Sequence, residues 1–327
     1  MSFDGYKTLI KEGDVVIVYL TPSQIYSVEA LPKITNKKGN RVDNVFQTPY
    51  GALRCGDLIG ARFGTKVQLS KGWAYVLQPT PELWTVTLPH RTQIIYTPDI
   101  SMIILQLEIS PGSVVVESGT GSGSLSHALI RAVKPHGHLH TFEFHEGRAA
   151  TAQEEFKQHG LSQYVTVRQR DVCERGFGDE LNDTADAVFL DLPHPWLAVP
   201  HAIRALKSTG GRLCSFSPCI EQVQRTCLAL LKAGFQEMQT MEVLQTQWSV
   251  QQRNVPVVNL EFVRTEKAAG EAEKKERETA KAVVAVPPAS LPGHTGYMTF
   301  ATLPPLWART LQMSLNETDI DAEGDAE

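Results

Sequence analysis

Acidic residues close several apolar segments of this chain, and such an arrangement can bind a ligand. Glu117, Glu143 and Asp191 each end an apolar segment, and Asp171 lies just past another. In an open sheet of parallel strands, ligands bind beyond the carboxyl ends of the strands. Carboxylates placed there accept hydrogen bonds from hydroxyl and amino groups, and they attract cations. We therefore expect one ligand site, assembled from the ends of several strands.

The first of these acids leads into a loop with glycine at three alternate positions. Residues 114–123 read Val-Val-Val-Glu-Ser-Gly-Thr-Gly-Ser-Gly, and residues 124–133 have the pattern of a helix. The valines are typical of a buried strand in a parallel sheet. Glycines let the backbone turn sharply and approach a ligand with no Cβ in the way. Because a helix N-terminus points its amides toward the space over the loop, the pattern indicates a cofactor loop.

The spacing of the glycines distinguishes between cofactors. A dinucleotide fingerprint is G-x-G-x-x-G, but here Gly123 comes one residue early and Ser124 occupies the third fingerprint position. The nearby carboxylate of Glu117 would also repel a pyrophosphate. S-adenosylmethionine carries a sulfonium and an ammonium, which this carboxylate would attract, so we predict S-adenosylmethionine as the cofactor. Its predicted contacts along the loop are Glu117, Gly119, Gly121, Ser122, Gly123 and Ser124.

The other strand ends supply further cofactor contacts. Glu143 lies twenty residues after Gly123, where its carboxylate can accept both ribose hydroxyls. Arg148 is expected in the first turn of the next helix, either over the same pocket or solvated on the helix face. Asp171 can accept the N6 amino hydrogen of an adenine, and Val172 can pack on the face of the ring.

A second motif, Asp-Leu-Pro-His-Pro-Trp at residues 191–196, follows the most apolar strand after the loop. Its prolines restrict the φ angles of the loop, and Trp196 offers a face on which a base could stack. Asp191 would stand opposite the transferable methyl group. Enzymes that methylate exocyclic amines of bases carry a related loop with an acid or Asn, then Pro-Pro and an aromatic residue. The interposed Leu192 and His194 favour a different acceptor atom.

Length and composition limit the class of protein. The chain has 327 residues, of which 42% are hydrophobic, and this predicts about two domains. We expect no membrane segment and no signal peptide, and the five cysteines show no C-x-x-C pair, as is typical of reduced intracellular thiols. The net charge is −5, yet residues 1–80 hold ten Lys or Arg against six acids. A nucleic-acid substrate would therefore need phosphate contacts from a partner subunit.

The pattern of apolar runs predicts the domain organisation. Residues 1–80 contain short β-type runs separated by glycine and proline, typical of a small β-rich, barrel-like domain. Residues 81–264 alternate strands and helices, which predicts an α/β domain with a parallel sheet covered on both faces. The expected strands are 139–143, 165–168, 185–191, 212–216, 241–244 and 297–300, and the expected helices are 149–160, 200–208 and 220–233. Residues 265–292 are a charged insertion, either an exposed helix or a segment without structure, and 305–327 an acidic, unstructured tail.

Several motifs in order resemble the tRNA (adenine-N1) methyltransferases, which act on adenine 58 of the T loop, and most closely the eukaryotic catalytic subunits. The resemblance covers residues 1–265 and 293–303, and leaves the charged insertion and the acidic tail outside. The matching segments are GTGSG at 119–123, DLPHPW at 191–196, PTPELWTVTLPHRTQIIY at 79–96, SFSPCIEQVQRTC at 215–227 and GHTGYMTFAT at 293–302.

This resemblance implies an N-terminal β domain and a class I, Rossmann-like methyltransferase domain whose last strand, within residues 293–304, is antiparallel. It implies tRNA as substrate, a catalytically inactive paralogous subunit that helps to bind the RNA in a two-plus-two tetramer, and a nuclear location. Donor contacts map onto the residues given above, and Gln93 and Ile95 are expected to close over the donor. Asp191 would be catalytic, and Pro193, His194 and Trp196 would contact the substrate.

Two other functions stay open. One is a catalytically inactive RNA-binding or assembly subunit of the same fold, against which the intact glycines and Asp191 argue. The other is a methyltransferase for protein carboxylates or small molecules, against which the Pro-His-Pro-Trp loop and the basic first domain argue.

Two further groups of residues have simple alternative explanations. His136, His138 and His140 invite a metal site, but no acid or cysteine nearby in sequence completes a ligand set, so we expect no metal. The aromatic residues Trp73, Tyr75 and Trp84 fit RNA binding or packing between elements equally well.

Overall fold

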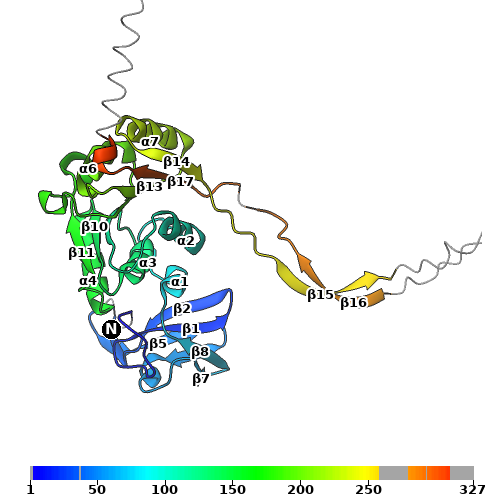
Figure 1. Cartoon of the computed structure of the whole chain (residues 1–327). Coiled ribbons are helices and arrows are strands. Elements are labelled where there is room, and N and C mark those ends of the chain that lie inside the picture. Colours follow the sequence, from blue (N-terminus) through cyan, green and yellow to red (C-terminus); the bar gives the residue numbers. More distant parts are fainter. Residues whose placement is uncertain (1–2, 37, 258–278, 292, 310–327) are drawn as a thin grey trace, which may run out of the picture. The chain divides into compact units, whose positions relative to one another are not determined.

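The computed structural model describes residues 3–36, 38–257, 279–291 and 293–309. Its N-terminal part is β-rich, as predicted, and contains a four-stranded antiparallel sheet in the order β2-β1-β8-β7 (Figure 1). These strands are β1 (Val15–Thr21), β2 (Gln24–Glu29), β7 (Thr65–Gln68) and β8 (Trp73–Leu77). Two hairpins accompany the sheet, β3 (Lys33–Thr35) with β4 (Arg41–Asp43) and β5 (Val45–Thr48) with β6 (Gly51–Arg54), followed by the short helix η1 (Cys55–Leu58). The apolar core of this N-terminal part includes Val16, Val18, Leu53 and Val76.

The second sheet has seven strands in the order β11-β10-β9-β12-β13-β17-β14. They are β9 (Val114–Ser118), β10 (His138–Glu143), β11 (Val165–Gln169), β12 (Ala187–Asp191), β13 (Gly211–Ser217), β14 (Gln236–Met241) and β17 (Tyr297–Leu303). The first five strands in this order are parallel, whereas β17 runs antiparallel to both of its neighbours. The predicted antiparallel last strand is therefore confirmed. The strand order reverses between β9 and β12, which is where an open α/β sheet binds ligands.

Helices cover both faces of this sheet, as the alternation of strands and helices predicted. The helices are α1 (Pro81–Thr85), α2 (Thr97–Gln106), α3 (Ser124–Val133), α4 (Glu146–Gln158), α5 (Val172–Arg175), η2 (Asp179–Leu181), α6 (Pro195–Ala205) and α7 (Ile220–Lys232). Successive strand residues point to opposite faces. On β9, Val116 packs in one cluster with Ala198 of α6, whereas the neighbouring Glu117 accepts a hydrogen bond from Ser126 of α3.

Two elements begin five residues before their predicted starts. The helix expected over 200–208 begins at Pro195, because the first position of a helix favours proline and two prolines compete for that place. The strand expected over 241–244 lies at 236–241. It is an edge strand with exposed polar residues, so an apolar run does not reveal it.

Residues 243–295 form a second compact unit. Its described part is an antiparallel hairpin of β15 (Ser249–Pro256) and β16 (Thr279–Val286). The composition of residues 265–292 predicted an exposed helix or no structure, and this is wrong for 279–286, because alternating Ala and Val there favour a strand. Of the predicted acidic, unstructured tail, residues 306–309 form a helical turn, so the prediction is wrong there, and residues 310–327 lie outside the described residues. None of the helices in the described part of the chain has the length and apolar character needed to cross a bilayer.

Candidate active site

The glycine loop connects β9 to α3 at the point where the strand order reverses. Gly119, Gly121 and Gly123 all have positive φ, at 99°, 54° and 76°. A Cβ on Gly119 would lie 2.3 Å from the carbonyl oxygen of Asp191, and one on Gly121 would lie 2.7 Å from Oγ1 of Thr92. These positions need glycine both for their conformation and for the close approach of two other segments. Gly123 precedes α3 and does not line the cavity below the loop.

Residues 91–95 are bound to this loop by hydrogen bonds. The amides of Arg91 and Thr92 donate to Oγ of Ser122, at 2.9 and 3.1 Å. The hydroxyl of Ser124 donates to the carbonyl of Ile95 at 2.8 Å. The sequence predicted that Gln93 and Ile95 lie over the donor, and both line the same cavity as the loop. The two serines therefore fix one wall of the cavity relative to another.

Glu143, at the end of β10, is the charged centre of the cavity. Its carboxylate accepts from the amide of Gly121 at 3.0 Å, from the amide of His145 at 3.1 Å and from Arg148 at 2.7 Å. Burial by itself would raise the pKa of Glu143, but the Arg148 guanidinium and these amides outweigh it and hold the pKa below its usual value. Glu143 is therefore ionised at neutral pH. Arg148 lines the cavity by way of this ion pair.

Glu117 behaves differently because it is only 1% exposed. Burial raises its pKa to about 7, against hydrogen bonds from Ser126 and Thr141 that stabilise the charge, and the nearby Asp191 and Glu143 raise it further. The sequence predicted a full negative charge here that attracts a cation. In the structure the carboxyl is about half ionised at neutral pH, and a cationic ligand would complete its ionisation.

Asp171 and Val172 lie at the start of α5. Asp171 caps this helix by accepting from the amide of Cys173 at 3.0 Å. Both residues line the cavity. Their expected contacts with an adenine ring stay a prediction.

Asp191 ends β12 directly beneath the glycine loop. Burial raises its pKa to about 6, and the negative charge of Glu143 adds to this effect. The next residues, Pro193 and His194, also line the cavity. Gln222 of α7 donates to the carbonyl of Pro193 at 2.9 Å and holds the loop in place.

Trp196, whose contact with the substrate stays a prediction, lies outside the cavity lining. It lies in the first turn of α6 and does not line the cavity, whereas Leu197 does. Successive residues of a helix point about 100° apart, and because α6 begins at Pro195, only Leu197 turns toward the cavity. The ring of Trp196 instead faces the guanidinium of Arg225, 5.2 Å from its centroid.

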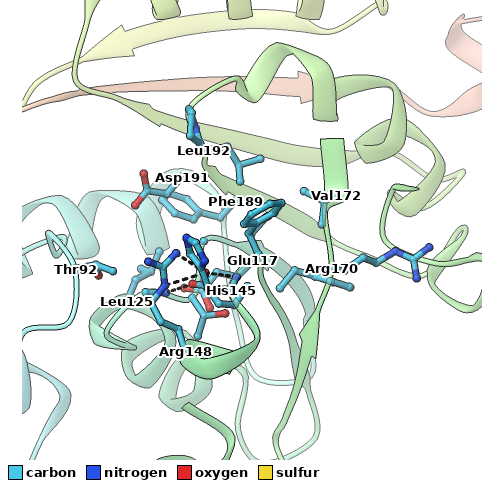
Figure 2. Close-up of a pocket in the computed structure, with 18 of the residues that line it drawn as sticks. Thr92, Glu117, Leu125, His145, Arg148, Arg170, Val172, Phe189, Asp191 and Leu192 are labelled. Carbon is cyan, nitrogen blue, oxygen red and sulfur yellow. Dashed lines mark hydrogen bonds and ion pairs between the residues drawn. The ribbon is translucent and has the colours of Figure 1, made fainter. Parts of the chain in front are cut away.

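These elements enclose a cavity of about 660 Å³, a volume suited to a nucleoside-sized ligand and part of a second. Figure 2 shows Asp191 and Leu192 on one side of it and His145 and Arg148 on the other.

Sequence reasoning missed several lining residues. One signal was available in the sequence, because Phe144 and His145 directly follow the strand-end acid Glu143. The lining residues not predicted include Thr92, Ile94, Leu125, Phe142, Phe144, His145, Arg170, Phe189, Leu192 and Leu197.

A histidine pair that the sequence did not single out supports the glycine loop from behind. Nδ1 of His127 donates to the carbonyl of Gly123 at 2.6 Å, and its Nε2 lies 2.8 Å from Nδ1 of His159. Burial lowers the pKa of both rings, so both are neutral. Glu155 lies within ligand distance of this pair, but its carboxylate is bound to Arg91 at 2.7 Å. The two neutral histidine rings therefore support the glycine loop through hydrogen bonds from the side away from the cavity.

Comparison with known proteins identifies close relatives. The sequence model of the family described as tRNA methyltransferase complex GCD14 subunit matches residues 72–303. A tRNA (adenine(58)-N(1))-methyltransferase catalytic subunit from Dictyostelium discoideum is 42% identical over 316 residues, which cover 90% of this chain and 96% of the relative. A protein of the same description from Candida albicans is 44% identical over 261 residues, which cover 78% of this chain and 74% of the relative.

Solved structures support the fold. A SAM-dependent O-methyltransferase from Thermotoga maritima has a TM-score of 0.70 and 27% identity, covering 91% of this chain and 95% of that chain. The tRNA (m1A58) methyltransferase TrmI from Aquifex aeolicus has a TM-score of 0.65 and 22% identity, covering 90% of this chain and 98% of that chain. The predicted class I methyltransferase fold with a separate N-terminal β domain is confirmed.

Proposed function

Because the chain belongs to the tRNA methyltransferase complex GCD14 subunit family, we propose that it is the catalytic subunit of an S-adenosylmethionine-dependent tRNA methyltransferase that modifies N1 of adenine 58. The observation that carries this proposal is the contact between the glycine loop and Asp191, where no Cβ fits between Gly119 and the Asp191 carbonyl. Donor loop and acceptor loop thus face one cavity.

The cavity fits the donor in its chemistry. Gly119 and Gly121 line the cavity without a Cβ, and Glu117 and Glu143 supply acceptors and negative charge. We assign the ribose hydroxyls to Glu143, the adenine of the donor to Asp171 and Val172, and the cationic end to Glu117. When bound, S-adenosylmethionine supplies a methyl group on a sulfonium, and the sulfur leaves as a neutral thioether.

Asp191 acts on the acceptor base. The adenine must leave its stack to enter the cavity, where Pro193 and His194 would contact it. Its N1 lone pair forms the new C–N bond, and the base becomes a cation without losing a proton. A carboxylate that accepts the N6 amino hydrogen raises the electron density at N1 and stabilises the developing charge. We assign this role to Asp191, whose carboxylate is mostly ionised above the pKa of about 6.

The description of the family as part of a methyltransferase complex supports a partner. We infer that a non-catalytic paralogue assembles with this chain in a two-plus-two tetramer and supplies phosphate contacts to tRNA, and that the assembly works in the nucleus. A net charge of −5 on this chain agrees with such a division of labour.

Mass spectrometry of nucleosides tests the proposal. Unmodified tRNA is incubated with donor and enzyme, with and without the co-expressed partner, using wild type and Asp191→Ala. The wild-type complex should form N1-methyladenosine, and Asp191→Ala should bind the donor in calorimetry but fail to transfer the methyl group. Absence of N1-methyladenosine in both wild-type arms would contradict the proposed activity, and near-normal turnover of Asp191→Ala would contradict the role of this residue.

A further inference from the structure

One face of the four-stranded N-terminal sheet is covered at one end and open at the other. At the covered end, the hydroxyl of Ser27 donates to the carbonyl of Thr87 at 3.0 Å, and Val15 packs against Trp84 and Leu88. The contact of Val15 with Trp84 places Trp84 in an apolar core. Of the two explanations offered for Trp84, RNA binding and packing between elements, the structure supports packing. Toward the other ends of β1, β7 and β8, the same face carries exposed side chains, among them Lys66 and Trp73.

The open end carries aromatic side chains and a lysine in neighbouring cross-strand positions. Tyr19 of β1 pairs with Tyr75 of β8, which pairs in turn with Lys66 of β7. Trp73 lies two residues before Tyr75 and so points to the same face. We call these four residues, Tyr19, Lys66, Trp73 and Tyr75, the aromatic–lysine patch.

The geometry within the patch is specific. The rings of Trp73 and Tyr75 lie 5.2 Å apart between centroids, at 81° to each other. Nζ of Lys66 lies 3.9 Å from the Trp73 centroid and 5.5 Å from the Tyr75 centroid. Trp73 nevertheless stays 46% exposed. A cation held over aromatic rings and a large exposed indole thus share one open surface.

This combination fits an unpaired nucleotide. Bases stack on exposed aromatic rings irrespective of their sequence, and a lysine on a flexible stem pairs with the phosphate beside the base. The charge of this domain also favours a nucleic acid. Residues 1–80 carry ten Lys or Arg and six acids, whereas the whole chain has a net charge of −5. A protein partner that covered the patch would have to bury the ammonium of Lys66 and supply a counter-charge for it.

We propose that the aromatic–lysine patch is a second RNA contact, at which a base of the tRNA outside the modified position stacks on Trp73 and its phosphate pairs with Lys66. The proposal rests on the proposed function, because it takes tRNA as the substrate. The catalytic cavity of about 660 Å³ has a volume suited to one nucleoside-sized ligand and part of a second, so affinity for the rest of the RNA must come from surfaces outside it.

The experiment measures tRNA affinity of the assembled complex at several salt concentrations. Trp73→Ala should raise the Kd by about 5- to 100-fold without changing the salt slope, because stacking contributes affinity but no counterion release. Lys66→Gln should lower the slope of log Kd against log salt by about 0.7 to 1. Trp73→Phe should retain most of the affinity. Trp307→Ala is the matched control, since Trp307 is 69% exposed and far along the chain from the patch.

Three outcomes would overturn the inference. One is an unchanged tRNA affinity of Trp73→Ala. Another is an equal loss of affinity in Trp307→Ala. The third is dissociation of the complex by Trp73→Ala in light scattering, which would identify the patch as a subunit contact.

The proposed function is judged separately by the wild-type complex. Wild type that binds tRNA but forms no N1-methyladenosine contradicts the activity, whereas an active wild type with an unaffected Trp73→Ala contradicts only the patch.

Discussion

At the scale of the residue, environment decides what each carboxylate of the cavity can do. Glu143 is held ionised by Arg148 and by backbone amides, whereas burial keeps Glu117 about half neutral at pH 7. The pKa of Asp191, about 6, lies between the pKa values of Glu143 and Glu117. Three acids at the ends of neighbouring strands therefore differ in charge at the same pH, and this difference follows from burial, hydrogen-bond donors and neighbouring charges and not from their residue type.

The raised pKa of Glu117 predicts that donor binding releases a proton. The donor is cationic and favours the ionised carboxylate, so its affinity should rise with pH up to about 7 and then level off. At pH 6, Glu117→Gln should reduce the proton release by about one, measured by calorimetry in buffers of different ionisation enthalpy. The same proton release in wild type and Glu117→Gln would contradict this prediction.

The pKa of Asp191 predicts a pH profile for the chemical step. Its carboxylate must be ionised to stabilise the cationic product, so the single-turnover rate should fall as pH drops below about 6 and stay level above it. Asp191→Asn should reduce the rate by about 100-fold or more and remove this pH dependence. The control is Asp57→Asn, at an exposed position of η1. A wild-type profile without a step near pH 6 would count against the assignment.

At the scale of the element, the site depends on two loops that touch. The sequence predicted the strands β9, β10 and β12 and their terminal acids, because apolar β-branched runs and glycines are local signals. It did not predict that the glycine loop leaves no room for a Cβ beside Asp191, since 72 positions separate Gly119 from Asp191 in the sequence. The start of α6 was missed because two prolines, Pro195 and Pro200, compete for the first helical position, and the side of the helix on which Trp196 lies was missed with it.

This contact predicts the effect of Gly119→Ala. The added Cβ would lie 2.3 Å from the Asp191 carbonyl oxygen, at a φ of 99°, so the two loops must separate. Because a misplacement of about 1 Å can cost 100-fold in rate, we expect at least this loss in single-turnover experiments, with weaker donor binding in calorimetry. Gly147→Ala on α4 is the control, because a Cβ there meets no atom within 4 Å. Equal rates for the two variants would be incompatible with the proposed contact.

At the scale of the whole molecule, the N-terminal residues join the β domain to the methyltransferase domain. The amide of Phe3 donates to the carbonyl of His159 at 3.1 Å. Its ring lies 4.6 Å from that of His159 and 5.8 Å from that of Trp84 between centroids. Through His159 and His127, this contact reaches the carbonyl of Gly123. The support of the donor loop thus extends to the first residues that the structure describes.

Removal of this ring should destabilise the protein. We expect Phe3→Ala to cost about 2 kcal/mol of unfolding free energy, because a half-buried aromatic ring leaves a cavity, and to lower Tm by about 5 °C. Tyr6→Ala is the control, since Tyr6 is 88% exposed. Thermal unfolding followed by circular dichroism measures both variants, and the same Tm for both would rule out a joining role for Phe3.

The sequence by itself determined the fold class, the cofactor loop and the acids at the strand ends, because these depend on periodicity, glycine and local order along the chain. The tertiary structure decided which of these acids carries a charge, which side chains line the cavity and which aromatic residues stay exposed. Trp84 and Trp73 have the same residue type, yet one packs in a core and the other lies exposed beside Lys66. The reason is physical, since burial, pKa and exposure depend on neighbours in space that a local pattern does not specify.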